Sequence, residues 1–251
     1  MKRFERTKLL LGQEGLERLR QSTVTVVGMG AVGSFAVEGL ARAGVGSLRL
    51  VDFDEIRESN INRQLFALES TIGRSKVEVA RQRILDINPD CEVETHSCFM
   101  DRETFSSIFT APTGALLDAI DSLGPKSELL AAAAKAGIPL ILSSMGAAYR
   151  TDPSLIRVRD LSETQSCPLA RLIRKRLRRL GVTTGIRCVY SMEKMPPSSQ
   201  RAVPADQEEE VVQRGRRRTP LGSLACITGI FGLTMACETT MILAGKRKAA
   251  S

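Results

Sequence analysis

The sequence has 251 residues, of which 43% are hydrophobic and 25% charged, and this size allows one large α/β domain or a domain with an appendage. Lys and Arg outnumber Asp and Glu by 36 to 28, and the net charge of +8 fits either a polyanionic partner or a basic surface that keeps the protein soluble. Six cysteines without a CxxC pair and a single histidine argue against a structural zinc site and for reduced thiols in a cytoplasmic protein.

The first half of the chain alternates between helical and extended patterns. Its N-terminus is too charged for a secretory signal, and residues 5–20 predict an amphipathic helix with Leu9, Leu10, Leu16 and Leu19 on one side. The following elements are expected as strands over 23–27, 47–53, 91–98, 115–120 and 139–143 and helices over 31–43, 74–87 and 125–136. This alternation predicts an α/β fold with a mostly parallel sheet and helices on both faces.

The second half is less regular. Residues 169–180 predict a helix with a narrow apolar side and a dense basic remainder, and residues 193–220 lack periodicity, so we expect a mobile loop there. Residues 221–245 are long and apolar enough to span a membrane. Their many small residues and Glu238 favour a buried core helix instead, and membrane contact remains the alternative.

A glycine-rich turn joins the first strand to the next helix. Gly28 permits a tight turn, Gly30 lets the backbone approach a phosphate, and Gly33 lets the helix pack on its strand. The free amides at the start of that helix favour an anion. Asp52, at the end of the second strand, is placed to accept hydrogen bonds from ribose hydroxyls, unless it is only a capping aspartate. NAD-binding and ATP-binding proteins share these features.

Further polar residues favour ATP over NAD. Asn60, Arg63 and Gln64 form a polar cluster after the second strand. Lys76 follows this cluster, and Asp121 closes a later strand. The pyrophosphate of NAD needs few side-chain cations, whereas a reacting triphosphate needs Arg, Lys and magnesium to neutralise its charge. Arg63 and Lys76 taken singly fit ordinary surface charges. Together with Asp121, a carboxylate suited to Mg²⁺, they predict an ATP site.

Several stretches resemble the ThiF/ubiquitin-activating-enzyme superfamily, namely RFERTKLLLGQEGLERL, GMGAVGS, VDFDEIRESNINRQ, IGRSK and LLDAIDS. The resemblance implies a Rossmann-like fold that forms a homodimer and adenylates a carboxylate with ATP. By position it implies a ribose-binding role for Asp52, phosphate contacts for Asn60, Arg63 and Lys76, a magnesium ligand in Asp121, and an Arg6 that reaches into the partner's ATP site.

Stretches spread over most of the length are similar to the tRNA threonylcarbamoyladenosine dehydratase branch, namely INPDCEVE, DAIDSLGPK, TDPSLIRVRDLSETQSCPLARLIRKRLRR and GIRCVYSMEK. This resemblance implies activation of the threonyl carboxylate of the modified adenosine and its closure to a cyclic base with release of AMP. The basic residues of 171–179 and 214–218 are then expected to meet tRNA phosphates, unless they are only solvated surface. We expect one domain over 1–251, with a dimer arm at 1–20, a nucleotide-binding core at 21–150 and a substrate- and tRNA-facing part at 151–251.

Other functions stay open from the sequence. The chain could adenylate the C-terminal carboxylate of a ubiquitin-like or sulfur-carrier protein, with a sulfur-transfer protein as partner, although the two CxxC pairs usual in those enzymes are missing. A nucleotide-binding module without adenylation and an NAD dehydrogenase are weaker alternatives. Cys188 could be reactive or structural, and Cys167 stands where relatives often have an acid. His96, in a strand-like stretch, is expected to be structural.

Overall fold

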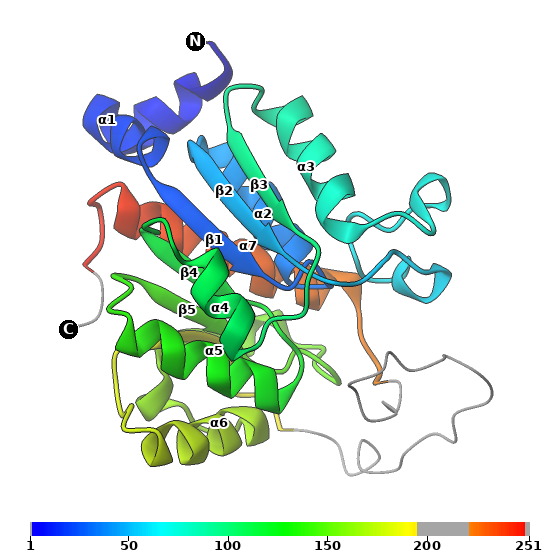
Figure 1. The fold of residues 1–251 in the computed structure, drawn as a ribbon, viewed down its shortest axis with the longest axis vertical. Helices are drawn as coiled ribbons and strands as arrows, with labels where there is room; N and C mark the ends of the chain where they lie inside the picture. Colours follow the sequence, from blue (N-terminus) through cyan, green and yellow to red (C-terminus); the bar gives the residue numbers. More distant parts are fainter. Residues whose placement is uncertain (1, 195–220, 249–251) are drawn as a thin grey trace.

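A computed structural model describes residues 2–194 and 221–248, and it contains one seven-stranded sheet in the order β3-β2-β1-β4-β5-β7-β6 (Figure 1). The strands are β1 (Thr23–Val27), β2 (Ser47–Val51), β3 (Glu92–His96), β4 (Ala115–Asp118), β5 (Ile141–Ser144), β6 (Ile156–Asp160) and β7 (Arg187–Ser191). Every pair of neighbouring strands is parallel except β6 with β7, and β6 forms one edge of the sheet. The predicted mostly parallel sheet is therefore confirmed.

Helices cover both faces of this sheet, as the sequence predicted. They are α1 (Glu5–Arg20), α2 (Gly33–Ala43), α3 (Lys76–Ile87), α4 (Arg102–Ile108), α5 (Leu123–Lys135), α6 (Pro168–Arg179) and α7 (Ala225–Leu243). One apolar core joins the sheet to α1, α2, α3 and α7, and a second joins it to α4, α5 and α6. The two cores lie on opposite sides of the strands, because successive strand residues alternate between them.

The apolar stretch 221–245 forms α7, which packs along α2 inside the fold (Figure 1). Small residues make this close approach possible: an added Cβ at Gly39 would lie 2.6 Å from the Ala236 Cβ, and one at Gly229 would touch the ring of Phe35. Of the described helices, α7 alone is long and apolar enough to cross a membrane. Its packing agrees with the core-helix interpretation.

The prediction for α1 was wrong in one respect. Leu16 and Leu19 are buried, but Leu9 and Leu10 are 78% and 77% exposed. The cause is Gly12, whose φ of 78° breaks the helix. The first half of the helix is turned so that Leu11, rather than Leu9 and Leu10, faces the core. The leucines of residues 5–20 therefore do not share one side.

Other differences are local. The helix α4 and the strand β6 were not predicted. The strands β2 and β4 end at Val51 and Asp118, two residues earlier than predicted. Most of the predicted mobile loop, residues 195–220, lies outside the described residues.

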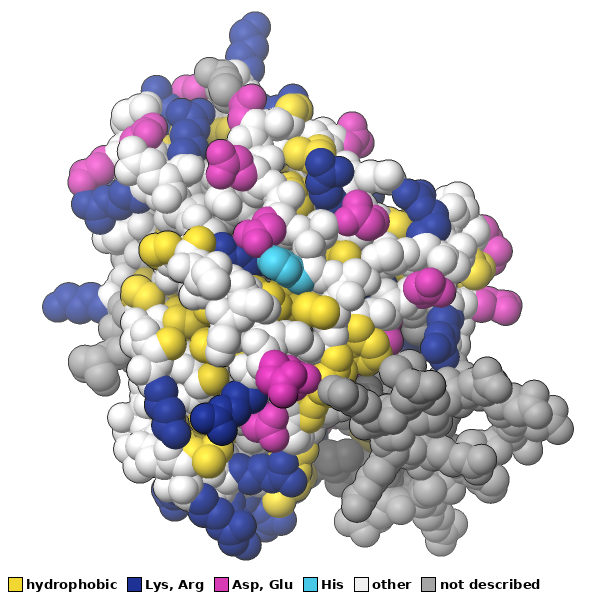
Figure 2. Space-filling view, viewed as in Figure 1, with side chains coloured by type: hydrophobic (Ala, Val, Ile, Leu, Met, Phe, Trp, Pro, Cys, Tyr) yellow, Lys and Arg dark blue, Asp and Glu magenta, His cyan; other side chains and the backbone are white. Residues whose placement is uncertain are grey.

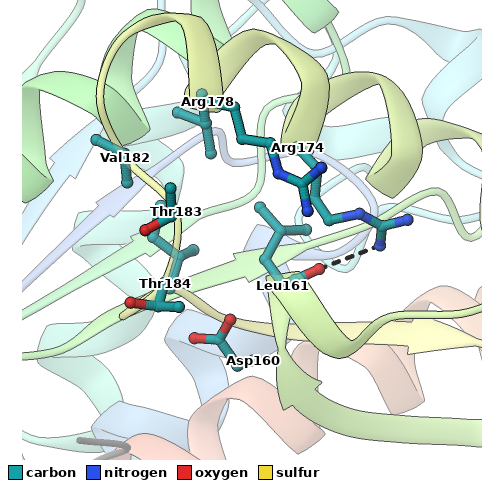
Figure 3. Close-up of a pocket in the computed structure, with 9 residues that line it drawn as sticks. Asp160, Leu161, Arg174, Arg178, Val182, Thr183 and Thr184 are labelled. Carbon is teal, nitrogen blue, oxygen red and sulfur yellow. Dashed lines mark hydrogen bonds between the residues drawn. The ribbon is translucent and has the colours of Figure 1, made fainter.

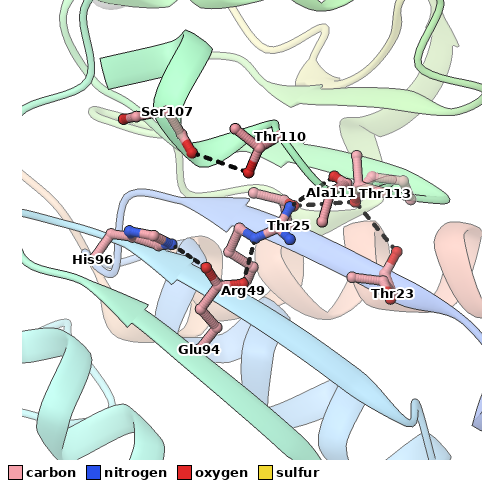
Figure 4. A network of polar contacts seen from close by, with 10 residues as sticks. Thr23, Thr25, Arg49, Glu94, His96, Ser107, Thr110, Ala111 and Thr113 are labelled. Atoms are coloured by element: carbon pink, nitrogen blue, oxygen red, sulfur yellow. Dashed lines mark hydrogen bonds and ion pairs between the residues drawn. The ribbon is translucent and has the colours of Figure 1, made fainter. Parts of the chain in front are cut away.

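The single histidine belongs to a polar network on one face of β2 and β3 (Figure 4). Arg49 is 4% exposed and its Nε donates to Glu94 at 2.7 Å, while the other carboxylate oxygen of Glu94 lies 2.7 Å from His96 Nε2. Burial alone would raise the pKa of Glu94, but the hydrogen bonds and charges of Arg49 and His96 hold it below its usual value. His96 thus has the structural surroundings expected of it.

Candidate functional site at the carboxyl edge of the sheet

The predicted glycine turn lies where the carboxyl ends of β1, β2 and β4 meet. Gly28 has a φ of 93° and donates its N–H to Val51 O at 2.8 Å, and an added Cβ there would lie 2.9 Å from Ala119 O. A Cβ at Gly33 would lie 1.7 Å from Gly28 O. Both glycines are therefore required by the fold itself, as the sequence predicted.

Gly30 differs from the other two glycines of the turn. The nearest atom to an added Cβ is Gln64 Nε2, at 3.9 Å, so a methyl group here would meet only the end of one flexible side chain. The backbone here is open on the side where an anion would approach the start of α2. This geometry suits the phosphate-approach role predicted for Gly30.

The carboxylate of Asp52 fastens the glycine turn to the end of β2. One oxygen accepts from Met29 N at 2.6 Å and the other from Asp54 N at 2.8 Å. Burial raises the pKa of Asp52 above its usual value, while the charge of Lys76 and the two amides oppose that rise. Each carboxylate oxygen has a second lone pair, so the ribose contact predicted for Asp52 remains compatible with these bonds.

Lys76 opens α3 directly beside Asp52. Its side chain is 6% exposed, and Nζ lies 2.8 Å from the carboxylate of Asp54, which is 38% exposed. The backbone repeats the contact, because Lys76 N donates to Asp54 O at 3.1 Å. A buried ammonium that reaches a partly exposed carboxylate beside the glycine turn supplies the positive charge that the sequence predicted there.

The segment with Asn60 and Arg63 is folded onto the same turn. Asn60 is 8% exposed and its side-chain oxygen accepts from Arg57 N at 3.2 Å, so it shapes its own 3-10 turn (Glu58–Asn60). Leu65 N donates to Ser34 Oγ at 3.2 Å, which ties the segment to the first turn of α2. Arg63 is half-buried and donates to Ser59 O at 2.7 Å.

Asn62 is a site neighbour to which the sequence assigned no role, whereas Gln64 was expected in the polar cluster with Asn60 and Arg63. Gln64 is 9% exposed and lies over Gly30, while Asn62 donates from Nδ2 to Ser223 O at 3.3 Å, which joins this segment to the chain leading into α7. Both belong to the polar run that contains Asn60 and Arg63, so that run was the available signal.

Asp121 lies on the turn between β4 and α5, exposed at the same carboxyl edge. Below it is a pair that sequence reasoning missed: Lys126 Nζ lies 2.7 Å from Asp118 Oδ2, and both side chains are 0% exposed. Ser143 of β5 also donates to Asp118, at 2.6 Å. The predicted nucleotide residues Asp52, Asn60, Arg63, Lys76 and Asp121 thus come from segments that converge on one edge of the sheet.

Arg6 is not part of this cluster. It is exposed on α1, next to Phe4, which packs against Gly44 at the far end of α2. Since α2 begins at the glycine turn and ends at Gly44, Arg6 lies toward the opposite edge of its own sheet. Within one chain, therefore, Arg6 cannot serve the site that the other predicted residues form.

The basic helix α6 lies at the far end of the sheet from β3, and Figure 2 shows Lys and Arg side chains gathered at that end of the molecule. Arg174 folds back and donates to Leu161 O at 3.2 Å and Thr164 O at 2.8 Å, whereas Arg171 and Lys175 are exposed. Figure 3 shows a shallow pocket beneath this helix, where the dashed line marks the Arg174–Leu161 bond. Asp160, which lines it, pairs with the first residue of β7, so this pocket is at the edge opposite the glycine turn.

The cysteines named from the sequence are buried. Cys188 is 0% exposed on β7, and burial raises the pKa of its thiol far above the usual range. Cys167 is 6% exposed and caps α6, with Sγ accepting from Ala170 N at 3.5 Å. The N-cap position that this thiol occupies is one that Asp also favours. Both cysteines fit the structural alternative.

Comparison with known proteins places this geometry in a family. Residues 4–251 match the ThiF family. The tRNA threonylcarbamoyladenosine dehydratase of Bacillus subtilis (strain 168) is 40% identical over 240 residues, which cover 96% of this chain and 94% of the relative. The crystal structure of the Escherichia coli tRNA N6-threonylcarbamoyladenosine dehydratase in complex with ATP superposes with a TM-score of 0.85 at 32% identity, covering 98% of this chain and 95% of the other. The molybdopterin-synthase adenylyltransferase of Salmonella typhimurium (strain LT2) is 36% identical over only 66% of each chain.

Proposed function

The chain belongs to the ThiF family, and we propose that it is an ATP-dependent tRNA-modifying enzyme that dehydrates N6-threonylcarbamoyladenosine to its cyclic form. The observation that carries this proposal is the similarity to dehydratases of that name along almost the whole of both chains. The convergence of the predicted nucleotide residues on one sheet edge supports it independently, because ligands of open parallel sheets bind outside the carboxyl ends of the strands.

The reaction consists of two displacements. A threonyl carboxylate oxygen attacks the α-phosphorus of ATP and pyrophosphate leaves; the carbamoyl nitrogen then attacks the acyl carbon, loses its proton, and AMP leaves. The nucleophile of the second step belongs to the substrate itself and has a high effective concentration, so no enzyme nucleophile is needed. The burial of Cys188 and Cys167 agrees with such a mechanism.

The chain supplies binding and charge to this reaction. The amides that follow Met29, at the start of α2, hold phosphates, Asp52 accepts from the ribose, and Gly30 leaves room for close approach. Lys76 is already paired with Asp54, so on nucleotide binding its ammonium shares its hydrogen bonds between that carboxylate and a phosphate. Asn60 and Arg63 add polar contacts from the segment tied to Ser34.

The donor set fits magnesium. No cluster of three or more His, Cys, Asp or Glu side chains suited to a metal occurs within 2–194 and 221–248. Mg²⁺ usually takes one or two carboxylates together with phosphates and waters, and Asp121 is an exposed carboxylate at the nucleotide edge. Mg²⁺ held there would neutralise phosphate charge, and Asp121 is the residue of this chain that would hold it.

The enzyme acts as a homodimer in this proposal. Arg6 cannot reach its own site, and the exposed Leu9 and Leu10 beside it offer the apolar contact that an arm on a partner needs. A symmetric dimer would place each Arg6 in the other subunit's ATP site. The exposed basic residues of α6 would meet tRNA phosphates.

The test is AMP release by the purified protein with ATP, Mg²⁺ and tRNA that carries threonylcarbamoyladenosine. The expected result is AMP and pyrophosphate together with loss of one water from the modified nucleoside, seen by mass spectrometry, and none of these with unmodified tRNA. The alternative, adenylation of a sulfur-carrier or ubiquitin-like protein that serves a sulfur-transfer partner, predicts pyrophosphate exchange driven by a diglycine-ending protein without RNA. That outcome, with no reaction on the tRNA, would overturn the proposal.

A further inference from the structure

A salt bridge with no exposed surface lies beneath the turn that carries Asp121. Asp118 ends β4, Lys126 lies near the start of α5, and both are 0% exposed with 2.7 Å between their charged atoms. Taking two charges out of water costs several kcal/mol for each ion, and well-packed apolar residues of similar volume often stabilise a fold as well or better. The pair therefore points to a role beyond stability.

The pair fixes the backbone next to Asp121. Lys126 Nζ donates to Ile120 O at 2.8 Å, and Asp118 Oδ1 accepts from Ile120 N at 3.0 Å. Both polar backbone groups of the residue before Asp121 are thus bound by buried charged side chains. Charge-assisted hydrogen bonds in a dry interior are strong, so this turn cannot shift without a large loss.

The same turn touches the glycine turn. Ala119 N donates to Val27 O at 2.8 Å, and the missing side chain of Gly28 leaves room for Ala119 O. Ala119 and Ile120 connect Asp118 to Asp121 without a gap. The buried pair consequently holds the backbone of Asp121 in a fixed place relative to the residues that receive the phosphates.

We propose that Lys126 and Asp118 are positioning residues that set how strongly metal and nucleotide bind together at the carboxyl edge. They touch neither ligand and act through the backbone of Asp121. The proposal rests on the proposed function in one respect, namely that Asp121 meets the metal of a bound Mg·ATP.

The test is the double substitution Asp118→Asn with Lys126→Met, which removes both charges and keeps the side-chain volumes close. ATP affinity is titrated with EDTA and with Mg²⁺. We expect a folded protein whose metal-free affinity stays within about threefold of wild type, while the gain in affinity on adding Mg²⁺ falls about tenfold. The matched control is Glu38→Gln with Arg83→Met, which removes an ion pair between α2 and α3 away from this edge and should leave the gain unchanged.

An unchanged Mg²⁺ gain in the folded double variant would overturn the proposal. If that variant does not fold, amide hydrogen exchange of wild type decides: the amides of Ala119 and Ile120 should be protected like those of β4, and fast exchange there would refute a fixed turn. A wild-type protein that binds Mg·ATP yet releases no AMP with modified tRNA would refute the proposed function while leaving this proposal open to the same titration.

Discussion

Gly232 of α7 lies directly against Val32, the residue before α2: an added Cβ at position 232 would lie 2.2 Å from the Val32 carbonyl oxygen. The same Cβ would lie 2.8 Å from the Phe35 Cβ. Val32 belongs to the glycine turn, so α7, although it lies near the C-terminal end of the sequence, packs directly against that turn. This contact explains why α7 is rich in small residues.

Replacing Gly232 by Ala should therefore damage both the fold and the site. The helix α7 or the turn has to move, at a cost of about 1–3 kcal/mol in the free energy of unfolding, and the phosphate amides should move with it. Urea unfolding and an ATP titration measure the two effects. The control is Gly124→Ala in α5, where the nearest atom is 3.8 Å away, so no tight contact opposes the added methyl group and the free energy of unfolding should change by less than about 1 kcal/mol. Equal stability of the two variants would contradict the packing argument.

The glycines of the turn should respond differently to the same substitution. Gly33→Ala should destabilise the protein strongly, because its Cβ would collide with Gly28 O. Gly30→Ala should leave the free energy of unfolding within about 0.5 kcal/mol of wild type, since the space in front of it is open. Its ATP affinity should nevertheless fall about tenfold or more, because the methyl group takes the place of a phosphate. Full ATP affinity in Gly30→Ala would show that no ligand approaches there.

Lys76→Met should make stability more sensitive to pH. Burial holds the pKa of Asp52 above its usual value and Lys76 opposes that rise, so removing the ammonium raises the pKa further. A raised carboxyl pKa favours folding fully below the unfolded pKa of about 4, and this contribution is lost as pH rises through the folded value. The stability difference between wild type and variant should thus grow as pH rises through the folded pKa of Asp52, by about 1.4 kcal/mol for each unit of added shift.

Urea unfolding at several pH values measures that difference, and a carboxyl NMR titration follows Asp52 directly. The control is Arg74→Met, which removes an exposed cation from the same loop and should give a constant difference. A difference that is constant for Lys76→Met as well would mean that its charge does not act on Asp52.

Local rules govern the carboxyl edge of the sheet, so the sequence could predict which segments meet there. Turn geometry requires Gly28 and Gly33, and parallel strands with short connections place Asp52 and Asp121 at one edge. The room in front of the Gly30 backbone follows from the same turn, and its phosphate contact stays a prediction.

The parts that were missed depend on tertiary contacts. Nothing local distinguishes the charge of Lys126 from a surface charge, and only the packing of α5 on β4 and β5 buries it against Asp118. The exposure of Leu9 depends on the break in α1 at Gly12. The helical pattern of residues 5–20 continues across Gly12 and gives no sign of this break. The strand β6 alternates Arg157 and Arg159 with apolar residues, so its five residues fit a charged loop as well as an edge strand.

Mixed dimers test the position of Arg6. Arg6→Ala and Asp121→Ala chains should each be inactive in AMP formation, because each lacks one part of every site. In a random mixture half of the dimers combine the two, and one of their two sites then holds both native residues, so about a quarter of the wild-type activity should return. Activity of the mixture no greater than that of the separate variants would refute a role for Arg6 in the partner's site, provided that an affinity tag on one variant co-purifies the other and so shows mixed dimers.

The exposed charges of α6 should control the salt dependence of tRNA binding. Arg171 and Lys175 lie one turn apart and are exposed, whereas Arg174 between them is occupied by backbone carbonyls. Each phosphate contact that is lost lowers the slope of log affinity against log salt by about 1. Arg171→Ala with Lys175→Ala should therefore reduce the slope by about 2 and leave ATP affinity unchanged.

Filter binding of tRNA between low and moderate salt measures this slope, and Arg81→Ala, an exposed cation on α3, is the matched control that should keep it. A slope that is the same in the double variant as in wild type would show that Arg171 and Lys175 of α6 do not contact tRNA phosphates. A weaker affinity with an unchanged slope would instead indicate that the substitutions disturb the helix rather than a phosphate contact, because only counterion release makes the slope depend on the number of charges.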